Sequence, residues 1–407
     1  METGATVTAL GSATGLIHHP YRPPAGFEAP QPAVYKASTV IFPTVAAMRS
    51  TEWKDKTGYT YGLHGTPTTF ALEERLATLE GGVHCLLVPS GLAAIAAVCL
   101  SLLRTGDEVL VPDNAYGPAK SLVQGELANW GITHRFYDPM DPEDLAAKIG
   151  PATQLVWLEA AGSVTLEFPD LLTMVRICQE RSVLTALDNT WGAGIAFRPF
   201  DLVPGADRPL AVDLTVHALT KYPSGGGDVL MGSIVTRDTA LAMRLKLTHM
   251  RLGLAVGAND AEAVLRGLPS IMLRYRAQDA AARTLANWAL ARPQFAQVLH
   301  PALPDSPGHA SWRSLCHDGA AGLFSVIVDE RFEQDAVDAF CNSLRLFKLG
   351  YSWAGPVSLV VPYSLAQMRS HWPTHLRAGT VVRFSIGLED VADLQADLNQ
   401  ALQGALR

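Results

Sequence analysis

Apolar runs of strand length alternate with candidate helices along the middle of the chain, and this alternation limits the folds open to it. Candidate helices lie at 119–130, 142–149 and 169–181. The runs that have the length of buried strands lie at 108–111, 155–159, 183–187, 214–219 and 232–236. Strands and helices in this order form a mostly parallel sheet that is covered by helices. The sequence therefore predicts an α/β fold with a mostly parallel central sheet.

The two ends of the chain differ in character from the middle. Residues 1–65 are rich in Pro, Gly, Thr and Ser and contain several aromatic residues, which predicts an extended arm that reaches a neighbouring subunit; a disordered tail is the alternative. From about residue 268 a long candidate helix, a Pro-rich stretch and further strand-like runs indicate a smaller α+β domain. We therefore expect an arm at 1–65, a large domain at 66–267 and a C-terminal α+β domain at 268–407.

Two residues with distinctive chemistry stand at the ends of predicted strands. Lys221 follows the run 214–219, and Asp188 follows the run 183–187. A lysine that is partly removed from water loses its proton more readily and can form a Schiff base. A carboxylate such as Asp188 can keep the ring nitrogen of a pyridine cofactor protonated, so that the ring accepts electrons. Ligands of such sheets bind where the strands end. The pair therefore indicates pyridoxal phosphate (PLP), although each residue alone also fits an ordinary structural role.

Other positions fit a site of this kind, and each has a structural alternative. The Ser90-Gly91 turn before a small-residue helix offers free backbone amides to a phosphate, although many strand–helix junctions look alike. Tyr116 follows a strand and a turn, where it can stack on a flat ring or be a half-buried loop residue. Arg383 lies in an apolar strand and needs an anion, either a substrate carboxylate or a structural acid. Thr220 can donate its hydroxyl to a phosphate or simply end its strand.

The composition narrows the class of protein. The chain of 407 residues is long enough for a large core, and 48% of its residues are hydrophobic. Its net charge of −7 argues against a nucleic-acid partner. Five scattered cysteines predict reduced thiols and a cytoplasmic location. We expect no signal peptide, no membrane span and no metal site, because the twelve histidines form no metal-binding pattern.

The motifs around Lys221, Asp188 and the other candidate residues resemble those of the Cys/Met-metabolism family of PLP enzymes and, within it, those of the bacterial cystathionine β-lyases. The likeness runs nearly from end to end of the chain. Its motifs are Tyr61-Gly62, Gly65-Thr66, Leu79-Glu80-Gly81-Gly82, Ser90-Gly91, Asp188-Asn189-Thr190-Trp191, Thr220-Lys221-Tyr222, Tyr351-Ser352-Trp353 and Arg383 with Gly387-Leu388-Glu389-Asp390. The resemblance implies the PLP-dependent transferase fold type I, which is aspartate aminotransferase-like, with PLP bound by the large domain. It also implies a homotetramer built from two catalytic dimers.

The resemblance assigns the cofactor and catalytic residues. Lys221 would carry PLP covalently and act as the catalytic base, and Asp188 would pair with the ring nitrogen. Tyr116 would stack on the ring and contact the substrate. Tyr61 would reach the phosphate from the neighbouring subunit. The implied catalytic residues are therefore Lys221, Tyr116 and Tyr61.

The resemblance also assigns groups to the phosphate and to the substrate. Three groups would hold the phosphate: the amides of Gly91 and Leu92 and the hydroxyl of Thr220. The substrate would be a small amino-acid thioether, and its α-carboxylate would bind Arg383. Ser352 and Trp353 would lie beside that carboxylate.

The implied reaction is a β-elimination. Lys221 would remove the Cα proton and then help the thiolate leave from Cβ, so that L-cystathionine or a related cysteine S-conjugate gives homocysteine or another thiol, pyruvate and ammonia. The Ser352-Trp353 pair and the lack of a cysteine in Tyr116-Gly117-Pro118 favour β-acting over γ-acting relatives. The alternatives are a γ-acting enzyme, either cystathionine γ-synthase or γ-lyase, and a PLP-binding regulatory protein with residual lyase activity.

The sequence departs from the family pattern at several positions. Leu63 stands where relatives carry an arginine that binds the phosphate across the subunit boundary, and His64 or Arg22 could take its place. Three other differences lie near the substrate side in relatives: Ala160-Ala161, Gly226 and Pro356-Val357. They bear on the identity of the substrate more than on the class of reaction.

Overall fold

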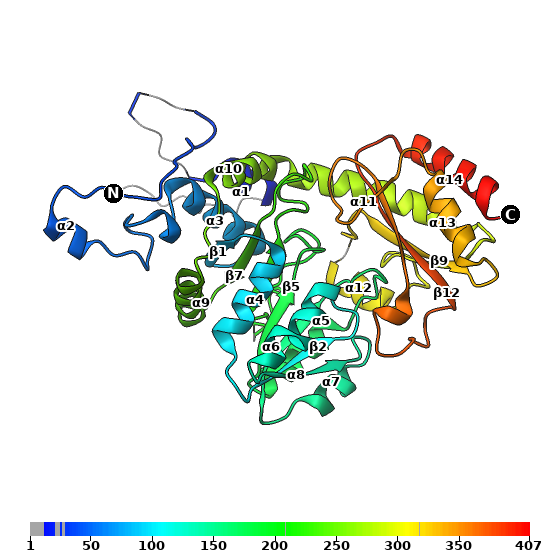
Figure 1. Ribbon diagram of the computed structural model, residues 1–407, viewed down its shortest axis with the longest axis horizontal. Helices are drawn as coiled ribbons and strands as arrows, with labels where there is room; N and C mark the ends of the chain where they lie inside the picture. The colour runs from blue at the N-terminus through cyan, green and yellow to red at the C-terminus, as the bar shows by residue number, and fades with distance from the viewer. Residues whose placement is uncertain (1–11, 21–24, 27–28, 208, 317) are drawn as a thin grey trace.

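The strands of the protein form two separate sheets, one of seven strands and one of five. The computed structural model describes residues 12–20, 25–26, 29–207, 209–316 and 318–407. Figure 1 shows the seven-stranded sheet in the middle of the molecule and the five-stranded sheet at its C-terminal end, with α11 (Ile271–Leu290) running between them. Within these residues no helix is long and apolar enough to cross a membrane.

The large sheet is mostly parallel, as the alternation predicts. Its strand order is β1-β7-β6-β5-β4-β2-β3, and β7 alone runs antiparallel to its neighbours β1 and β6. Its strands are β1 (His84–Val88), β2 (Glu108–Pro112), β3 (Thr133–Tyr137), β4 (Thr153–Glu159), β5 (Leu184–Asp188), β6 (Leu214–Ala218) and β7 (Gly232–Thr236). All five predicted strand runs are confirmed, with ends that differ by no more than two residues.

Helices cover both faces of the large sheet. One layer consists of α4 (Gly91–Leu102), α5 (Gly117–Gln124), α6 (Glu126–Asn129) and α9 (Thr239–Leu252). The other consists of α3 (Pro67–Glu80), α7 (Pro142–Lys148), α8 (Leu171–Glu180) and α10 (Ala258–Gly267). Along β4, Leu155 and Trp157 face the first layer, while Val156 and Leu158 face the second. Strands that are buried on both faces need apolar residues throughout, which explains the continuous apolar runs in the sequence.

The second sheet is smaller and mostly antiparallel. Its order is β10-β11-β12-β9-β8. The strands are β8 (Phe295–Leu299), β9 (Leu323–Asp329), β10 (Lys348–Leu349), β11 (Leu359–Tyr363) and β12 (Gly379–Ser385). Helices α11, α13 (Gln334–Ser343) and α14 (Val391–Ala405) pack on one face, against Val382 and Phe384 of β12. Because side chains alternate along a strand, Arg383 faces away from these helices.

Several elements differ from the expectation. The predicted helix 119–130 is broken into α5 and α6, because Gly125 has φ −99° and ψ −95°, outside the helical region. The sequence pattern does not predict β3, an edge strand whose residues are partly exposed and therefore more polar. The remaining short elements are α1 (Ser12–Ile17), α2 (Val45–Ser50), α12 (His309–Cys316) and the 3-10 turns η1 (Gly62–His64), η2 (Leu268–Ser270) and η3 (Leu365–Gln367).

The described part of the N-terminal segment holds little regular secondary structure beyond α1, α2 and η1. Figure 1 places α2 at the end of the molecule that lies farthest from the second sheet. Ile41 and Met48 are exposed there, although both are apolar, and Tyr61 is joined to Thr39 by a single β-bridge. Exposed apolar side chains of this kind fit a surface that another subunit covers. The arm at 1–65 and the domain limits at 66–267 and 268–407 stay predictions.

Candidate active site

Four segments meet at the carboxyl edge of the large sheet. Asp188 is the last residue of β5, Glu159 is the last residue of β4, and the two are partners in the strand register. Lys221 lies three residues after the end of β6. Gly91 begins α4, and a Cβ atom at Gly91 would lie 2.7 Å from the Cβ atom of Ala218 at the end of β6. The fold therefore brings Lys221, Asp188 and Gly91 to one edge of the sheet.

The amine of Lys221 is held in a partly desolvated position. Its Nζ donates a hydrogen bond to Ser352 Oγ at 2.8 Å and lies 5.5 Å from the centre of the Trp353 ring. Burial and, to a smaller extent, the Arg383 guanidinium lower the pKa of Lys221 to about 8, although the Asp188 carboxylate opposes the shift. An amine with this pKa keeps part of its population as free base near neutral pH, as a nucleophile or a general base requires.

Two carboxyl groups lie side by side at this edge. Burial raises the pKa of Asp188, while hydrogen bonds from Thr190 and the charges of His217 and Lys221 oppose the shift. The Thr190 amide donates to Asp188 Oδ1 at 3.0 Å. Burial and the neighbouring Asp188 together raise the pKa of Glu159 well above its usual range. A buried carboxyl group of this kind becomes a stable anion when a cation, such as a protonated ring nitrogen, lies against it.

The Tyr116 ring lies close to both carboxyl groups. Tyr116 caps the start of α5, and its amide donates to Glu159 Oε2 at 2.8 Å. Burial raises the pKa of the phenol, and the nearby Asp188 and Glu159 raise it further. The side chain is nevertheless 41% exposed, so one surface of Tyr116 is open to a flat partner.

The start of α4 is suited to an anion. Ser90 caps this helix through its side chain. The amides of Gly91 and Leu92 have no partner within the helix at this position, and the helix dipole favours a negative charge in front of them. A Cβ atom at Gly232, the first residue of β7, would lie 2.3 Å from the Ser90 carbonyl oxygen, so the turn rests directly on the strand. Thr220 is partly buried at the same edge of the sheet.

Arg383 reaches this edge from the second sheet. Its Nη2 donates to the Ser352 carbonyl oxygen at 3.0 Å, and its guanidinium lies 5.5 Å from the centre of the Tyr363 ring. The residue is only 8% exposed, and burial lowers its pKa. Its buried Nε has no hydrogen-bond partner in the described part of the chain. A buried guanidinium with an open donor is suited to a bidentate carboxylate.

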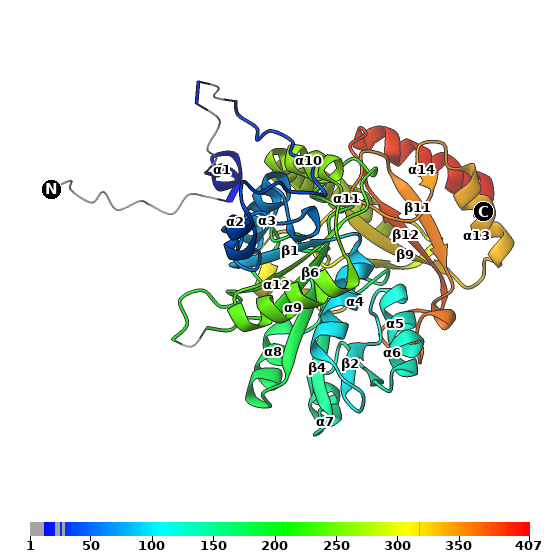
Figure 2. The same ribbon diagram turned by 60° about the vertical axis from the view of Figure 1, so that its left-hand side comes forward.

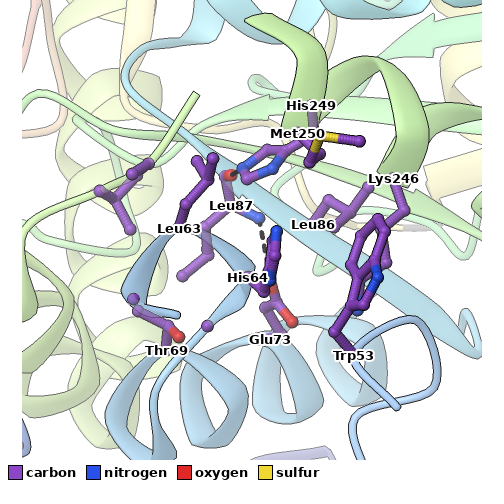
Figure 3. A pocket seen from close by; sticks show the side chains of 14 residues that line it. Trp53, Leu63, His64, Thr69, Glu73, Leu86, Leu87, Lys246, His249 and Met250 are labelled. Carbon is purple, nitrogen blue, oxygen red and sulfur yellow. Dashed lines mark hydrogen bonds between the residues drawn. The ribbon is translucent and has the colours of Figure 1, made fainter. Parts of the chain in front are cut away.

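Tyr61, Leu63 and His64 lie elsewhere in the same chain. Leu63 and His64 line a small pocket between α3 and α9 (Figure 3), which holds about 20 Å³ and so has room for about one water molecule. The His64 ring stacks on Trp53 at 4.3 Å, and its Nδ1 lies 2.8 Å from Thr60 Oγ1. Tyr61 is 48% exposed, and no contact in the described ranges joins it to Lys221. Arg22, the other possible substitute for the missing arginine, lies outside the described residues.

Glu159 is a member of this site that no sequence motif distinguishes from an ordinary strand-end acid. It ends an apolar strand just as Asp188 does, and that shared position is the signal by which the sequence could identify it. Its carboxyl group holds the Tyr116 amide and lies next to Asp188. It therefore links the backbone of the Tyr116 turn to the acid at the sheet edge.

The fold and the site define a PLP-dependent enzyme of fold type I. The residues fit the cofactor: an amine of lowered pKa at Lys221, a buried acid at Asp188, an accessible ring at Tyr116 and a helix start at Gly91. The hydroxyl of Ser352 is the present hydrogen-bond partner of the Lys221 amine.

Comparisons with known proteins agree with this class. The profile of the Cys/Met metabolism PLP-dependent enzymes matches residues 13–403. The cystathionine beta-lyase of Bordetella avium is 37% identical over 97% of this chain and 96% of its own. The cystathionine beta-lyase MetC of Escherichia coli (strain K12) is 32% identical over 90% of this chain and 91% of its own. The crystal structure of cystathionine gamma synthase from Xanthomonas oryzae pv. oryzae, in complex with aminoacrylate and cysteine, matches with a TM-score of 0.86 at 28% identity, covering 98% of this chain and 99% of that one.

The chain therefore belongs to the Cys/Met metabolism family of PLP-dependent enzymes, and PLP is its cofactor. The resemblance, the fold class, the cofactor and the enzyme class expected from the sequence are confirmed. The roles of the individual site residues stay predictions.

Proposed function

We propose that this enzyme is a carbon–sulfur β-lyase that cleaves L-cystathionine or a related cysteine S-conjugate into a thiol, pyruvate and ammonia. The observation that carries the proposal is the partly desolvated Lys221 amine, whose pKa is shifted both by the Asp188 carboxylate and by the Arg383 guanidinium with its open Nε. The names of the Bordetella avium and Escherichia coli relatives support the choice of β-elimination.

The residues of this chain divide the work as follows. Arg383 binds the substrate α-carboxylate through its free Nε, and Ser352 fixes the guanidinium through its carbonyl oxygen. PLP, when bound, supplies a ring that accepts electrons from Cα. Asp188 keeps a proton on the ring nitrogen, and Tyr116 orients the ring. The Gly91 and Leu92 amides, together with the Thr220 hydroxyl, bind the phosphate.

Lys221 moves the protons. Its free amine takes the proton from Cα onto Nζ, which the pKa of about 8 permits near neutral pH. The Cβ–S bond then breaks with its electron pair on sulfur, and Nζ returns the proton to the departing thiolate. Water converts the remaining three-carbon fragment into pyruvate and ammonia. Ser352 Oγ, 2.8 Å from Nζ, orients the amine during these transfers.

A γ-acting enzyme is the second candidate. It is supported by the match to a cystathionine gamma synthase, with a TM-score of 0.86, because that match shows a γ-acting enzyme with this fold. The same Lys221 amine and the same Arg383 guanidinium serve both reactions, so the residues described above do not separate them. The Ser352-Trp353 pair supports the β-lyase, with Trp353 packed edge to face on Tyr222 at 5.6 Å.

The products formed from L-cystathionine test the proposal. We expect the purified, PLP-loaded protein to release pyruvate and homocysteine, both identified by mass spectrometry. Release of 2-oxobutyrate and cysteine would instead establish γ-elimination. Lys221→Ala should abolish either activity, and any regulatory function that survived this change would point to a binding protein. A loaded protein that forms neither product from cystathionine or other cysteine thioethers would contradict the lyase assignment.

We also propose that the enzyme works as a homotetramer in the cytoplasm, with Tyr61 of the arm completing the phosphate site of a neighbouring subunit. The exposure of Tyr61, Ile41 and Met48 supports a covered arm surface, and the five buried, unpaired cysteines support a reducing compartment. Light scattering of the PLP-loaded protein measures the mass. A monomer of about 44 kDa at micromolar concentration would contradict the shared site.

A further inference from the structure

We infer that a buried polar cluster around Glu167 positions Tyr116 against Arg383 across the boundary between the two sheets. The Glu167 cluster consists of Asn114, Thr165, Glu167, Arg369 and His375. None of these side chains lies among the residues assigned to the cofactor or the substrate. The inference rests on the proposed function, because it concerns how the α-carboxylate site of Arg383 is held relative to the cofactor site.

Every donor in the cluster converges on one carboxylate. Asn114 Nδ2 donates to Glu167 Oε2 at 3.0 Å, and Thr165 Oγ1 donates to the same oxygen at 2.8 Å. The Arg369 guanidinium pairs with Oε2 as well, and His375 Nε2 lies 2.6 Å from Oε1. Arg369 also donates to Thr165 Oγ1 at 2.6 Å. A carboxylate whose hydrogen bonds are all satisfied away from water forms a rigid hub.

Burial makes this hub electrostatically strong. The Glu167 side chain is fully buried, and only 3% of the Arg369 side chain is exposed. Burial alone would raise the pKa of Glu167, but the hydrogen bond from His375, the Arg369 charge and the bonds from Asn114 and Thr165 lower it to about 2. Glu167 is therefore an anion near neutral pH, and it forms a buried ion pair with the Arg369 guanidinium.

The members of the cluster come from both sides of the domain boundary. Asn114 lies two residues before Tyr116, in the turn after β2, and Thr165 and Glu167 lie in the loop after β4. Arg369 and His375 lie in the strap, which we define as residues 364–378 between β11 and β12. Since β12 carries Arg383, the strap joins the substrate-side arginine to the turn that carries Tyr116.

A second set of contacts fixes the same two segments to each other. Ser370 donates to Asp113 through its amide at 3.0 Å and through its hydroxyl at 2.9 Å. Lys120 Nζ bonds Asp113 Oδ1 at 2.8 Å and the Met368 carbonyl oxygen at 2.7 Å. In Figure 2 the orange strap lies near α5, which begins just after Tyr116. The strap is thus bound along its length to the Tyr116 turn and not only at one point.

This arrangement predicts a specific loss when the cluster is broken. Lys221, Asp188 and Gly91 belong to the large sheet, and no hydrogen bond among the described residues joins them to the strap; of the cofactor residues, Tyr116 alone lies on a turn that the strap binds. The grip of Arg383 on an α-carboxylate does depend on it, because Arg383 belongs to the other sheet. Loosening the cluster should therefore weaken the recognition of the carboxylate more than the retention of PLP.

The test compares two ligands that differ only in the carboxylate. L-Alanine and ethylamine are titrated into the PLP-loaded protein, and their dissociation constants are read from the change in visible absorbance. The preference is the ratio of the dissociation constant of ethylamine to that of alanine. We expect the wild type to prefer alanine, so that this ratio is above one. In Arg369→Met the preference should fall about tenfold or more, since small displacements of a binding group have effects of this size. The amount of bound PLP should stay unchanged. Arg369→Lys, which keeps the charge, should restore part of the preference.

Matched variants separate positioning from general stability. Arg266→Met removes an arginine from the exposed Glu262–Arg266 pair, which is remote from the strap, and should leave the preference as in the wild type. If Arg369→Met does not fold, His375→Phe removes one donor of the cluster and should give a smaller loss in the same direction. An unchanged preference in a cluster variant whose melting temperature has fallen would refute the inference and leave the proposed function intact. A wild type that binds alanine and ethylamine equally would refute the carboxylate role of Arg383 and the inference with it.

Discussion

The pKa of Lys221 makes the uptake of PLP by the cofactor-free protein depend on pH in a defined way. A lysine in water has a pKa of 10.5, whereas burial, the Arg383 charge and the opposing Asp188 charge place that of Lys221 at about 8. At pH 7 about one amine in ten is then the free base, compared with about one in three thousand for an ordinary lysine. The fold therefore makes the reactive form about three hundred times more abundant at this pH.

The sign of the effect follows from the charge of the lysine. Only the unprotonated amine attacks the aldehyde of PLP, so the rate of uptake should rise about tenfold per pH unit below pH 8 and level off above it. Stopped-flow absorbance of the cofactor-free protein mixed with excess PLP measures this rate. In Arg383→Leu the positive charge that lowers the pKa is gone, so the rate should level off at a higher pH.

PLP itself also ionises in this pH range. Its effect on the rate cancels when the wild type is compared with Arg383→Leu, because the same cofactor is used with both proteins. Arg266→Met removes an exposed arginine that does not contribute to the Lys221 shift, so it is the matched control and should follow the wild type. A wild-type rate that keeps rising through pH 10 would show that the Lys221 amine is not desolvated. Identical profiles in the wild type and Arg383→Leu would refute the electrostatic part of the reasoning.

Three other changes test the site and its support. Asp188→Asn should lower turnover by about a hundredfold or more, measured as pyruvate release, because the ring nitrogen loses its carboxylate. Gly91→Ala should raise the dissociation constant of PLP and lower the free energy of unfolding by about 1–3 kcal/mol, because its Cβ would meet Ala218 at 2.7 Å. Gly404→Ala in α14, where a Cβ meets nothing within 4 Å, should do neither. Glu80→Gln should lower the free energy of unfolding in urea by about 3 kcal/mol, because its fully buried carboxylate bonds His217 Nδ1 at 2.9 Å; a loss under about 1 kcal/mol would contradict this.

The strands of the large sheet and the cofactor residues at their ends could be predicted from the sequence, because each produces a pattern within a short stretch of chain. A strand that is buried on both faces reads as a continuous apolar run, and Asp188 and Lys221 stand out because they interrupt that pattern where strands end. The edge strand β3 lacks this signal, since its exposed positions are polar. The break at Gly125 depends on a backbone conformation that an isolated glycine does not reveal.

The Glu167 cluster could not be predicted, for a different reason. Arg369 and Glu167 are separated by 202 residues, and His375 is separated from Glu167 by 208. Each of these residues, read alone in the sequence, has the character of an ordinary polar loop residue. Their shared burial appears only when the two sheets are docked, so no periodicity or spacing indicates it.

The place of β7 between β1 and β6 affects when this protein can become active during its synthesis. β1 leads into the turn of Gly91, β6 leads toward Lys221, and these two strands are neighbours of β7 but not of each other. The strand that joins them is the last of the seven to leave the ribosome, ending at Thr236. A nascent chain that stops before Gly232 therefore has both halves of the cofactor site but lacks the strand that holds them together. We expect such a fragment to capture no PLP, and visible absorbance of the fragment with PLP would show otherwise.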